Sequence, residues 1–139
     1  GPQTGSGVDV AAVDGLPARS QARMKVYAFD VDLTLDISGG PVTFADIWQL
    51  REGNILGLCG NWARVTTQYA PWSMLFSFVG PLGMSKADFM KQIAAYVPAE
   101  EYVMVGNDFA RGISPNDAIA AQEAGWRFIK EEAFAEGAR

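Results

Sequence analysis

One segment constrains the fold of this chain most: Val26-Tyr-Ala-Phe-Asp30-Val-Asp32-Leu-Thr34, an apolar run that ends in two aspartates and a threonine. Four apolar residues without alternation predict a strand that is buried on both faces of a parallel sheet. Asp30 and Asp32 would then both face the crevice in which such sheets hold ligands. Two carboxylates there cost free energy unless a cation or hydrogen-bond donors compensate them. The segment alone leaves two interpretations open, a ligand site and a solvated acidic turn.

The rest of the chain alternates between strand and helix patterns. Further strands are expected at 55–59, 75–79, 102–105 and 127–129, and helices at 43–52, 61–69, 85–96 and 114–124. Ser114 would open the last helix, with Pro115 in its first turn and Gly125 at its end. This alternation predicts an α/β fold, a single-domain Rossmann-like three-layer sandwich with a parallel sheet of about five strands. We assign this domain to residues 24–139, and we interpret residues 1–23 as a disordered tag or linker, with Met24 as the natural start.

Composition excludes several classes of function. The chain has no histidine, so Ser-His and Cys-His nucleophile systems and histidine metal sites are ruled out. The single cysteine, Cys59, is compatible with a reducing compartment, and we expect a cytoplasmic protein with no membrane segment. The net charge of −5 argues against unspecific binding of nucleic acid.

Polar residues and one glycine follow the predicted strands, at the edge where the carboxyl ends of the strands meet. They are Asp30, Asp32, Thr34, Gly60, Asn61, Lys86, Asn107, Asp108 and Asp117. Carboxylates without histidine or thiolate ligands favour a hard cation, Mg²⁺ above all. A magnesium ion and a lysine are what a phosphoryl group needs for charge neutralisation.

Lys86 lies in the first turn of a predicted helix, where it opposes the helix macrodipole. That position costs about 0.3–1 kcal/mol unless an anion lies nearby. A bound phosphate would make the same arrangement favourable. The other interpretation is a solvated surface lysine, and Lys91 is then the second choice for a phosphate contact.

The ordered motifs resemble those of the haloacid dehalogenase-like superfamily of phosphohydrolases. The matching pieces are Asp-x-Asp-x-Thr at 30–34, Leu58-Cys-Gly60-Asn61, Lys86 at a helix start, Val105-Gly-Asn-Asp108, and Asn116-Asp117 before an Ala-rich helix. The resemblance covers nearly all of residues 25–130. The gaps that often hold a cap domain, 36–54 and 61–86, are short here, so the chain resembles a capless member.

The resemblance implies a role for each matching residue. Asp30 would be the nucleophile that forms an aspartyl-phosphate, and Asp32 the general acid and then the base. Asp30, the Asp32 carbonyl and Asp108 would hold Mg²⁺, with Asn107 as the rival of Asp108. Thr34 would steady the loop through its hydroxyl, and Lys86 would bridge Asp30 and the phosphate.

Two departures from the family pattern bear on activity. Gly60 stands where the second motif normally has Ser or Thr, so the Gly60 N–H and the Asn61 amide would have to bind the phosphate instead. A lost hydrogen bond to a charged oxygen costs about 1.5–3 kcal/mol. In the fourth motif the spacing to Asp117 is long, which favours helix-start stabilisation over metal binding for that residue.

We therefore expect a Mg²⁺-dependent phosphatase for phosphomonoesters. Phosphorylated ends of nucleic acids stay open as substrates, and so does a homo-oligomer that closes the open site. Two rivals remain: a degenerate member that serves as a binding or scaffolding module, and a receiver-like domain. The aspartate pair on the first strand counts against the receiver, in which the phosphorylated aspartate is expected on a later strand.

Overall fold

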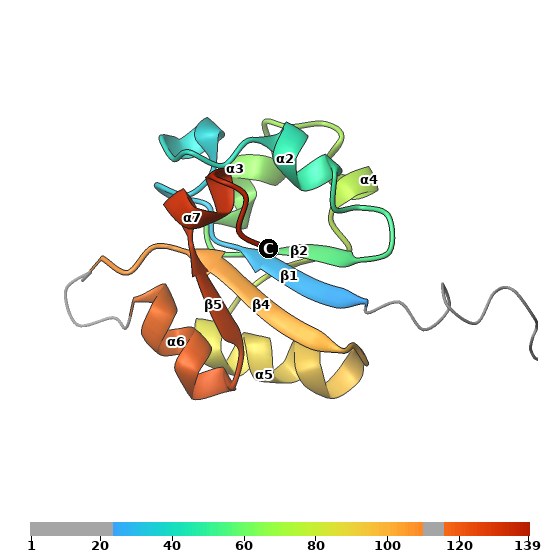
Figure 1. Cartoon of the computed structure of the whole chain (residues 1–139), viewed down its shortest axis with the longest axis vertical. Coiled ribbons are helices and arrows are strands. Elements are labelled where there is room, and N and C mark those ends of the chain that lie inside the picture. Colours follow the sequence, from blue (N-terminus) through green and yellow to red (C-terminus); the bar gives the residue numbers. More distant parts are fainter. Residues whose placement is uncertain (1–23, 110–115) are drawn as a thin grey trace, which may run out of the picture.

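Five parallel strands form one sheet in the order β3-β2-β1-β4-β5 (Figure 1). The structure is a computed structural model that describes residues 24–109 and 116–139. The strands are β1 (Lys25–Phe29), β2 (Ile55–Cys59), β3 (Phe78–Gly80), β4 (Glu101–Gly106) and β5 (Arg127–Lys130). β1 is central, paired along its whole length with β4 and over most of it with β2. The predicted α/β fold with a parallel sheet of five strands is confirmed.

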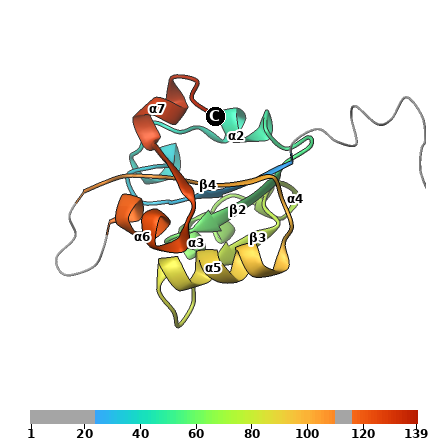
Figure 2. The same ribbon diagram turned by 60° about the horizontal axis from the view of Figure 1, so that its bottom comes forward.

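Helices cover both faces of the sheet. In the described residues they are α2 (Phe44–Trp48), α3 (Trp62–Thr66), α4 (Trp72–Leu75), α5 (Lys86–Tyr96), α6 (Asp117–Ala124) and α7 (Glu131–Ala135), and a 3₁₀ turn spans Asp36–Ser38. Figures 1 and 2 show α5 and α6 on one side of the sheet and α2 and α7 on the other. The result is the expected three-layer arrangement.

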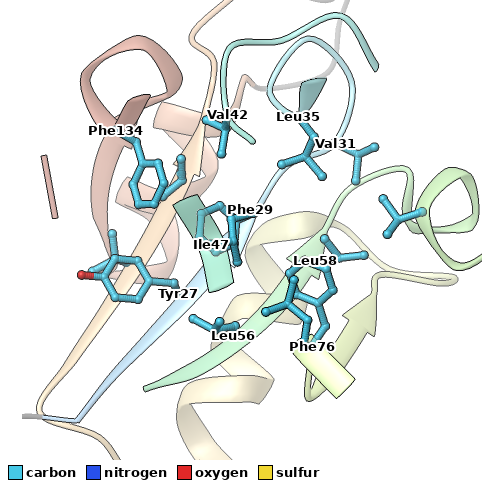
Figure 3. Packing of buried hydrophobic residues seen from close by; sticks show 14 of the residues in the cluster. Tyr27, Phe29, Val31, Leu35, Val42, Ile47, Leu56, Leu58, Phe76 and Phe134 are labelled. Carbon is cyan, nitrogen blue, oxygen red and sulfur yellow. The ribbon is translucent and has the colours of Figure 1, made fainter. Parts of the chain in front are cut away.

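The side chains of β1 alternate between the two layers because the side-chain period of a strand is two. Tyr27 and Phe29 enter the larger core cluster, in which Phe29 and Phe134 of α7 meet edge to face with ring centroids 5.3 Å apart (Figure 3). Val26 and Ala28 enter the second cluster, under α5 and α6. The central strand is therefore buried on both faces, as its continuous apolar sequence predicts.

Several element boundaries differ from the sequence-based prediction. The predicted strand at 75–79 is wrong in its first half, because Leu75 closes the one-turn helix α4 and the strand spans only Phe78–Gly80. The helices expected at 43–52 and 61–69 are each a single short turn or two, Phe44–Trp48 and Trp62–Thr66. Helix α7 was not predicted.

The helix starts follow their capping residues. Thr43 Oγ1 accepts from Asp46 N at 3.1 Å and Ser85 Oγ accepts from Asp88 N at 3.0 Å, the usual capping bond of a serine or threonine that has an acidic residue three positions later. The last long helix begins at Asp117 with Asn116 as its cap, and Gly125 ends it in the left-handed conformation. The predicted start at Ser114 and Pro115 lies outside the described residues.

Three of the tryptophan side chains pack against the hydrophobic core. Trp48, Trp62 and Trp72 pack against the larger cluster, and Trp62 Nε1 donates to the Pro81 carbonyl at 3.1 Å. Within the described residues, no helix is long and apolar enough to cross a membrane.

Candidate active site

The candidate site lies where the strand order reverses. The chain runs outward from β1 through β2 to β3 and then returns to pair β4 with the other side of β1. In open α/β sheets this switch point, at the carboxyl ends of the strands, is the usual ligand crevice. Asp30 follows β1 and Asn107 follows β4, and the Asp30 N–H donates to the Val105 carbonyl at 2.8 Å. The first aspartate of the pair is thus fixed at the switch point by the sheet itself.

Asp30 is buried, with 2% of its surface exposed. Its Oδ1 accepts from Lys86 Nζ at 3.0 Å, and its Oδ2 accepts from Asn107 Nδ2 at 3.2 Å. Each carboxylate oxygen therefore has a donor from a different element of the fold.

Lys86 joins Asp30 to a second buried carboxylate, that of Asp117. Lys86 is the first residue of α5, and its Nζ also donates to Asp117 Oδ1 at 2.7 Å. Asp117 Oδ2 accepts from the Asn107 N–H at 3.1 Å. Asp117 does lie in the first turn of α6, as expected, but its carboxylate is directed into the site. We call Asp30, Lys86, Asn107 and Asp117 the buried cluster.

The buried cluster has more negative than positive charge. Burial raises the pKa of Asp30 to about 7, and the Asp117 carboxyl beside it acts in the same direction, while Lys86 opposes both. Burial alone would lower the pKa of Lys86, but Asp30 and Asp117 together raise it above its ordinary value. Lysine therefore stays charged, and one carboxylate lacks a full counter-charge.

Asp32 has a different environment from Asp30. Its side chain is 41% exposed, and its carboxylate faces the start of α3. Asn61 Nδ2 donates to Asp32 Oδ1 at 3.3 Å and approaches Oδ2 at 3.5 Å, and Arg64 Nε lies 3.9 Å from Oδ1. The Asp32 carbonyl, in contrast, faces the buried cluster and accepts from Asn107 Nδ2 at 3.3 Å.

Gly60 forms the wall of the site next to Asp30. A Cβ at this position would overlap Asp30 Oδ1, so the observed position of Asp30 requires glycine. The Gly60 N–H donates to the Gly80 carbonyl at 2.9 Å. The expectation that the Gly60 N–H and the Asn61 amide bind the phosphate is not met. The Gly60 N–H donates to Gly80 in the sheet, and the Asn61 amide donates to Asp32.

Thr34 is fully buried in the loop after β1. Its main chain accepts from Val42 N and donates to the Val31 carbonyl, which fixes the loop. Its Oγ1 has no hydrogen-bond partner among the described residues. The prediction that the Thr34 hydroxyl steadies the loop is therefore wrong, because the loop is held through the backbone of Thr34.

Asp108 lies outside the buried cluster. Its side chain is 48% exposed and its nearest cation is Lys130, at 3.8 Å from Nζ to Oδ1. Its carbonyl accepts from Asn116 Nδ2 at 3.0 Å. In its place the buried cluster contains Asn107, the rival of Asp108, and Asp117, for which the sequence favoured a helix-start role alone. Lys91, the second choice for a phosphate contact, is exposed on α5.

Two other residues of the site carry little or no signal in the sequence. Arg64 is an ordinary charged residue of a short helix until the fold places it beside Asp32. Cys59 ends β2 just before Gly60, and burial raises the pKa of its thiol to about 12, which disfavours the nucleophilic thiolate form.

The site offers carboxylate and carbonyl oxygens, which are the types of ligand that Mg²⁺ prefers. Two of them, Asp30 Oδ2 and the Asp32 carbonyl oxygen, converge on one hydrogen-bond donor, Asn107 Nδ2. Mg²⁺ likewise requires several oxygen atoms directed at one point. In the described part of the chain no three or more acidic or thiol side chains form a metal-binding group. Mg²⁺ commonly uses only one or two carboxylates together with substrate phosphates, so a smaller donor set still suits it.

In comparisons with known proteins, no family model, no curated protein and no solved structure matches this chain. The resemblance to haloacid dehalogenase-like phosphohydrolases therefore depends on the motifs themselves. What the fold adds is that residues from the first, third and fourth of those motifs meet at one switch point.

Proposed function

We propose that the protein is a Mg²⁺-dependent phosphomonoester hydrolase that forms an aspartyl-phosphate on Asp30. One observation carries the proposal: a buried carboxylate at the end of the central strand, within hydrogen-bond distance of Lys86 and Asn107. A desolvated carboxylate with a fixed cation beside it is the arrangement of an activated nucleophile in a phosphate site. Lys86 would reduce the repulsion between Asp30 and the incoming phosphate.

The two aspartates of the first motif suit two different roles. Asp30 is buried and held by two donors, whereas the Asp32 side chain is half exposed and can reach solvent. Pairs of carboxyl groups in unlike environments are typical of an acid–base division of labour. Asp30 would attack phosphorus, and Asp32 would give a proton to the leaving oxygen and later take one from water.

Mg²⁺ would be held by Asp30, by the Asp32 carbonyl and by either Asn107 or Asp117, in place of Asp108. When bound, it supplies positive charge to the phosphoryl oxygens. The Asn107 side chain now donates hydrogen bonds to Asp30 Oδ2 and to the Asp32 carbonyl. As a metal ligand it would have to turn its amide oxygen toward the ion instead.

The short segments around the site favour an open site that can admit a bulky substrate. Segments 36–54 and 61–86 contain only short helical turns and strand β3, which leaves no room for a cap domain. We propose a phosphorylated small molecule or a phosphorylated macromolecular end as substrate, in a cytoplasmic protein whose entrance a second copy of the chain could close.

Hydrolysis of p-nitrophenyl phosphate and of a panel of nucleotide, sugar and protein phosphates tests the proposal. Turnover should require Mg²⁺, stop on addition of EDTA, and be lost in Asp30→Asn. Asp108→Asn serves as the matched control, since it removes a carboxylate from the same edge of the sheet but outside the buried cluster. If no substrate of the panel shows Asp30-dependent turnover, the proposal that the protein is a phosphatase is wrong.

A binding or scaffolding module is the second candidate, and one observation favours it. The Gly60 N–H is used by Gly80 and the Asn61 amide by Asp32, so the second motif offers no evident donor to a phosphate. Calorimetry with Mg²⁺ and beryllium fluoride separates the two candidates. An active site should bind the two together, with each increasing the affinity for the other, whereas a degenerate site should not.

A further inference from the structure

We propose that Asn61 and Arg64 are positioning residues that hold the Asp32 carboxyl for proton transfer. The inference rests on the proposed function, because it assumes that Asp32 exchanges protons with the leaving group and with water. Asn61 precedes α3 and Arg64 lies one turn further along it, and both approach the same carboxylate, at 3.3 Å and 3.9 Å. We call this pair the Asp32 clamp.

Asn61 departs from what its position in the helix predicts. An asparagine at an N-cap normally accepts a hydrogen bond from a main-chain N–H of the first turn, which stabilises the helix. Thr43, Ser85 and Asn116 all do so in this fold. The Asn61 side chain makes no such bond and instead directs its amide at Asp32. Asn61 therefore makes a hydrogen bond to Asp32 in place of the capping bond that would stabilise α3.

Arg64 contributes charge more than stability. Asp32 is the only carboxylate of the described residues within 4.0 Å of its guanidinium, and both side chains are partly exposed. An ion pair between such exposed side chains adds little to the free energy of unfolding. Its effect on a neighbouring proton transfer can be larger, because the charge of Asp32 changes during that transfer.

The clamp acts in both chemical steps. In the first, Asp30 forms a bond to phosphorus while the bond from phosphorus to the leaving oxygen breaks, and the Asp32 proton passes to that oxygen. The carboxylate left on Asp32 is stabilised by the two donors of the clamp. In the second, water forms a bond to phosphorus, Asp32 takes the proton of the water, and the Asp30–phosphorus bond breaks with its electron pair returning to Asp30.

The dependence of kcat/KM on the leaving group tests the clamp, because kcat/KM reports only the steps up to phosphoenzyme formation. The p-nitrophenolate ion leaves without a proton, whereas the alkoxide of glycerol 2-phosphate requires one. Arg64→Ala and Asn61→Ala should each lose about tenfold in kcat/KM on glycerol 2-phosphate and less than about threefold on p-nitrophenyl phosphate. Arg64→Lys should restore most of the loss, since the contact is a single one and needs only a cation.

Gln68→Ala is the matched control, an exposed change just beyond the end of α3. Equal losses on both substrates would overturn the clamp while leaving the phosphatase intact, because a general loss of structure does not discriminate between leaving groups. The clamp would also be overturned if the wild type hydrolysed p-nitrophenyl phosphate but not glycerol 2-phosphate, because Asp32 would then protonate no leaving group. Absence of any Asp30-dependent turnover in the wild type overturns the proposed function, and the clamp with it.

Discussion

At the scale of single residues, Gly60 determines how closely β2 can approach Asp30. Since a Cβ there would overlap Asp30 Oδ1, we expect Gly60→Ala to displace the carboxylate from Lys86 and to abolish Asp30-dependent turnover. Gly60→Ser, which would restore the hydroxyl of the family pattern, should do the same. Steady-state kinetics on the two variants measure this.

Gly53→Ala is the control for the glycine substitutions. Gly53 has a positive φ of 83° but nothing lies within 4 Å of an added Cβ. Alanine there should cost about 1–2 kcal/mol of stability through backbone strain alone. Its activity should stay that of the wild type, and equal loss of activity in Gly53→Ala and Gly60→Ala would contradict the steric argument.

The Asp30 carboxyl should also make the metal-free protein less stable as pH rises. Its pKa is raised from 3.8 to about 7 in the fold, so the proton stabilises the folded state. That stabilisation is complete below pH 3.8 and is lost as pH rises through about 7, by on the order of a few kcal/mol. Urea unfolding in EDTA at a series of pH values measures it.

Asp30→Asn isolates this contribution from the other ionisable groups. The wild type should lose stability relative to Asp30→Asn between about pH 4 and pH 8. A constant difference between the two proteins over that range would mean that Asp30 does not bind its proton more tightly in the fold.

Among the elements of the fold, the helix starts allow a direct comparison of two similar positions. Ser85 caps α5 and fixes the turn that carries Lys86, whereas Asn61 precedes α3 without capping it. Ser85→Ala should therefore cost about 1 kcal/mol of stability, and Asn61→Ala clearly less. Thermal unfolding of both variants tests this, and Ser85→Asp, which can still cap, should stay near the wild type.

The elements also determine how much of the fold was predictable. The strand at 25–29 and the helix from 86 were clear because a continuous apolar run and a capping box are local signals. Leu75 was placed in a strand because a short apolar run has no periodicity that separates strand from helix, and Pro71 in fact starts a helical turn there.

The candidate site was predictable only in part, for a related reason. Asp30 and Lys86 follow from local patterns, but the choice between Asn107 and Asp108 depends on which side chain faces inward where β4 ends. Asp117 has two roles at once, at a helix start and in the buried cluster, and sequence spacing supports only the first. Arg64 approaches Asp32 across 32 residues of chain, which no local pattern encodes.

At the scale of the whole molecule, α7 closes the larger core. Phe134 is fully buried against Tyr27 and Phe29 of the central strand. Phe134→Ala should therefore cost about 3–5 kcal/mol of stability. Tyr96→Ala, at an exposed position at the end of α5, should change it by less than about 0.5 kcal/mol. Denaturant unfolding of the pair measures the difference, and similar values would mean that α7 is not part of the core.

The central place of β1 has a consequence for synthesis of the protein in the cell. This strand emerges from the ribosome before β2 and β4, and Asn107, a partner of Asp30, is made 77 residues later. At usual translation rates that interval is about 4–15 s. Throughout it the buried central strand has no complete sheet to join, so nascent chains should need a chaperone or slow, cool expression to escape aggregation.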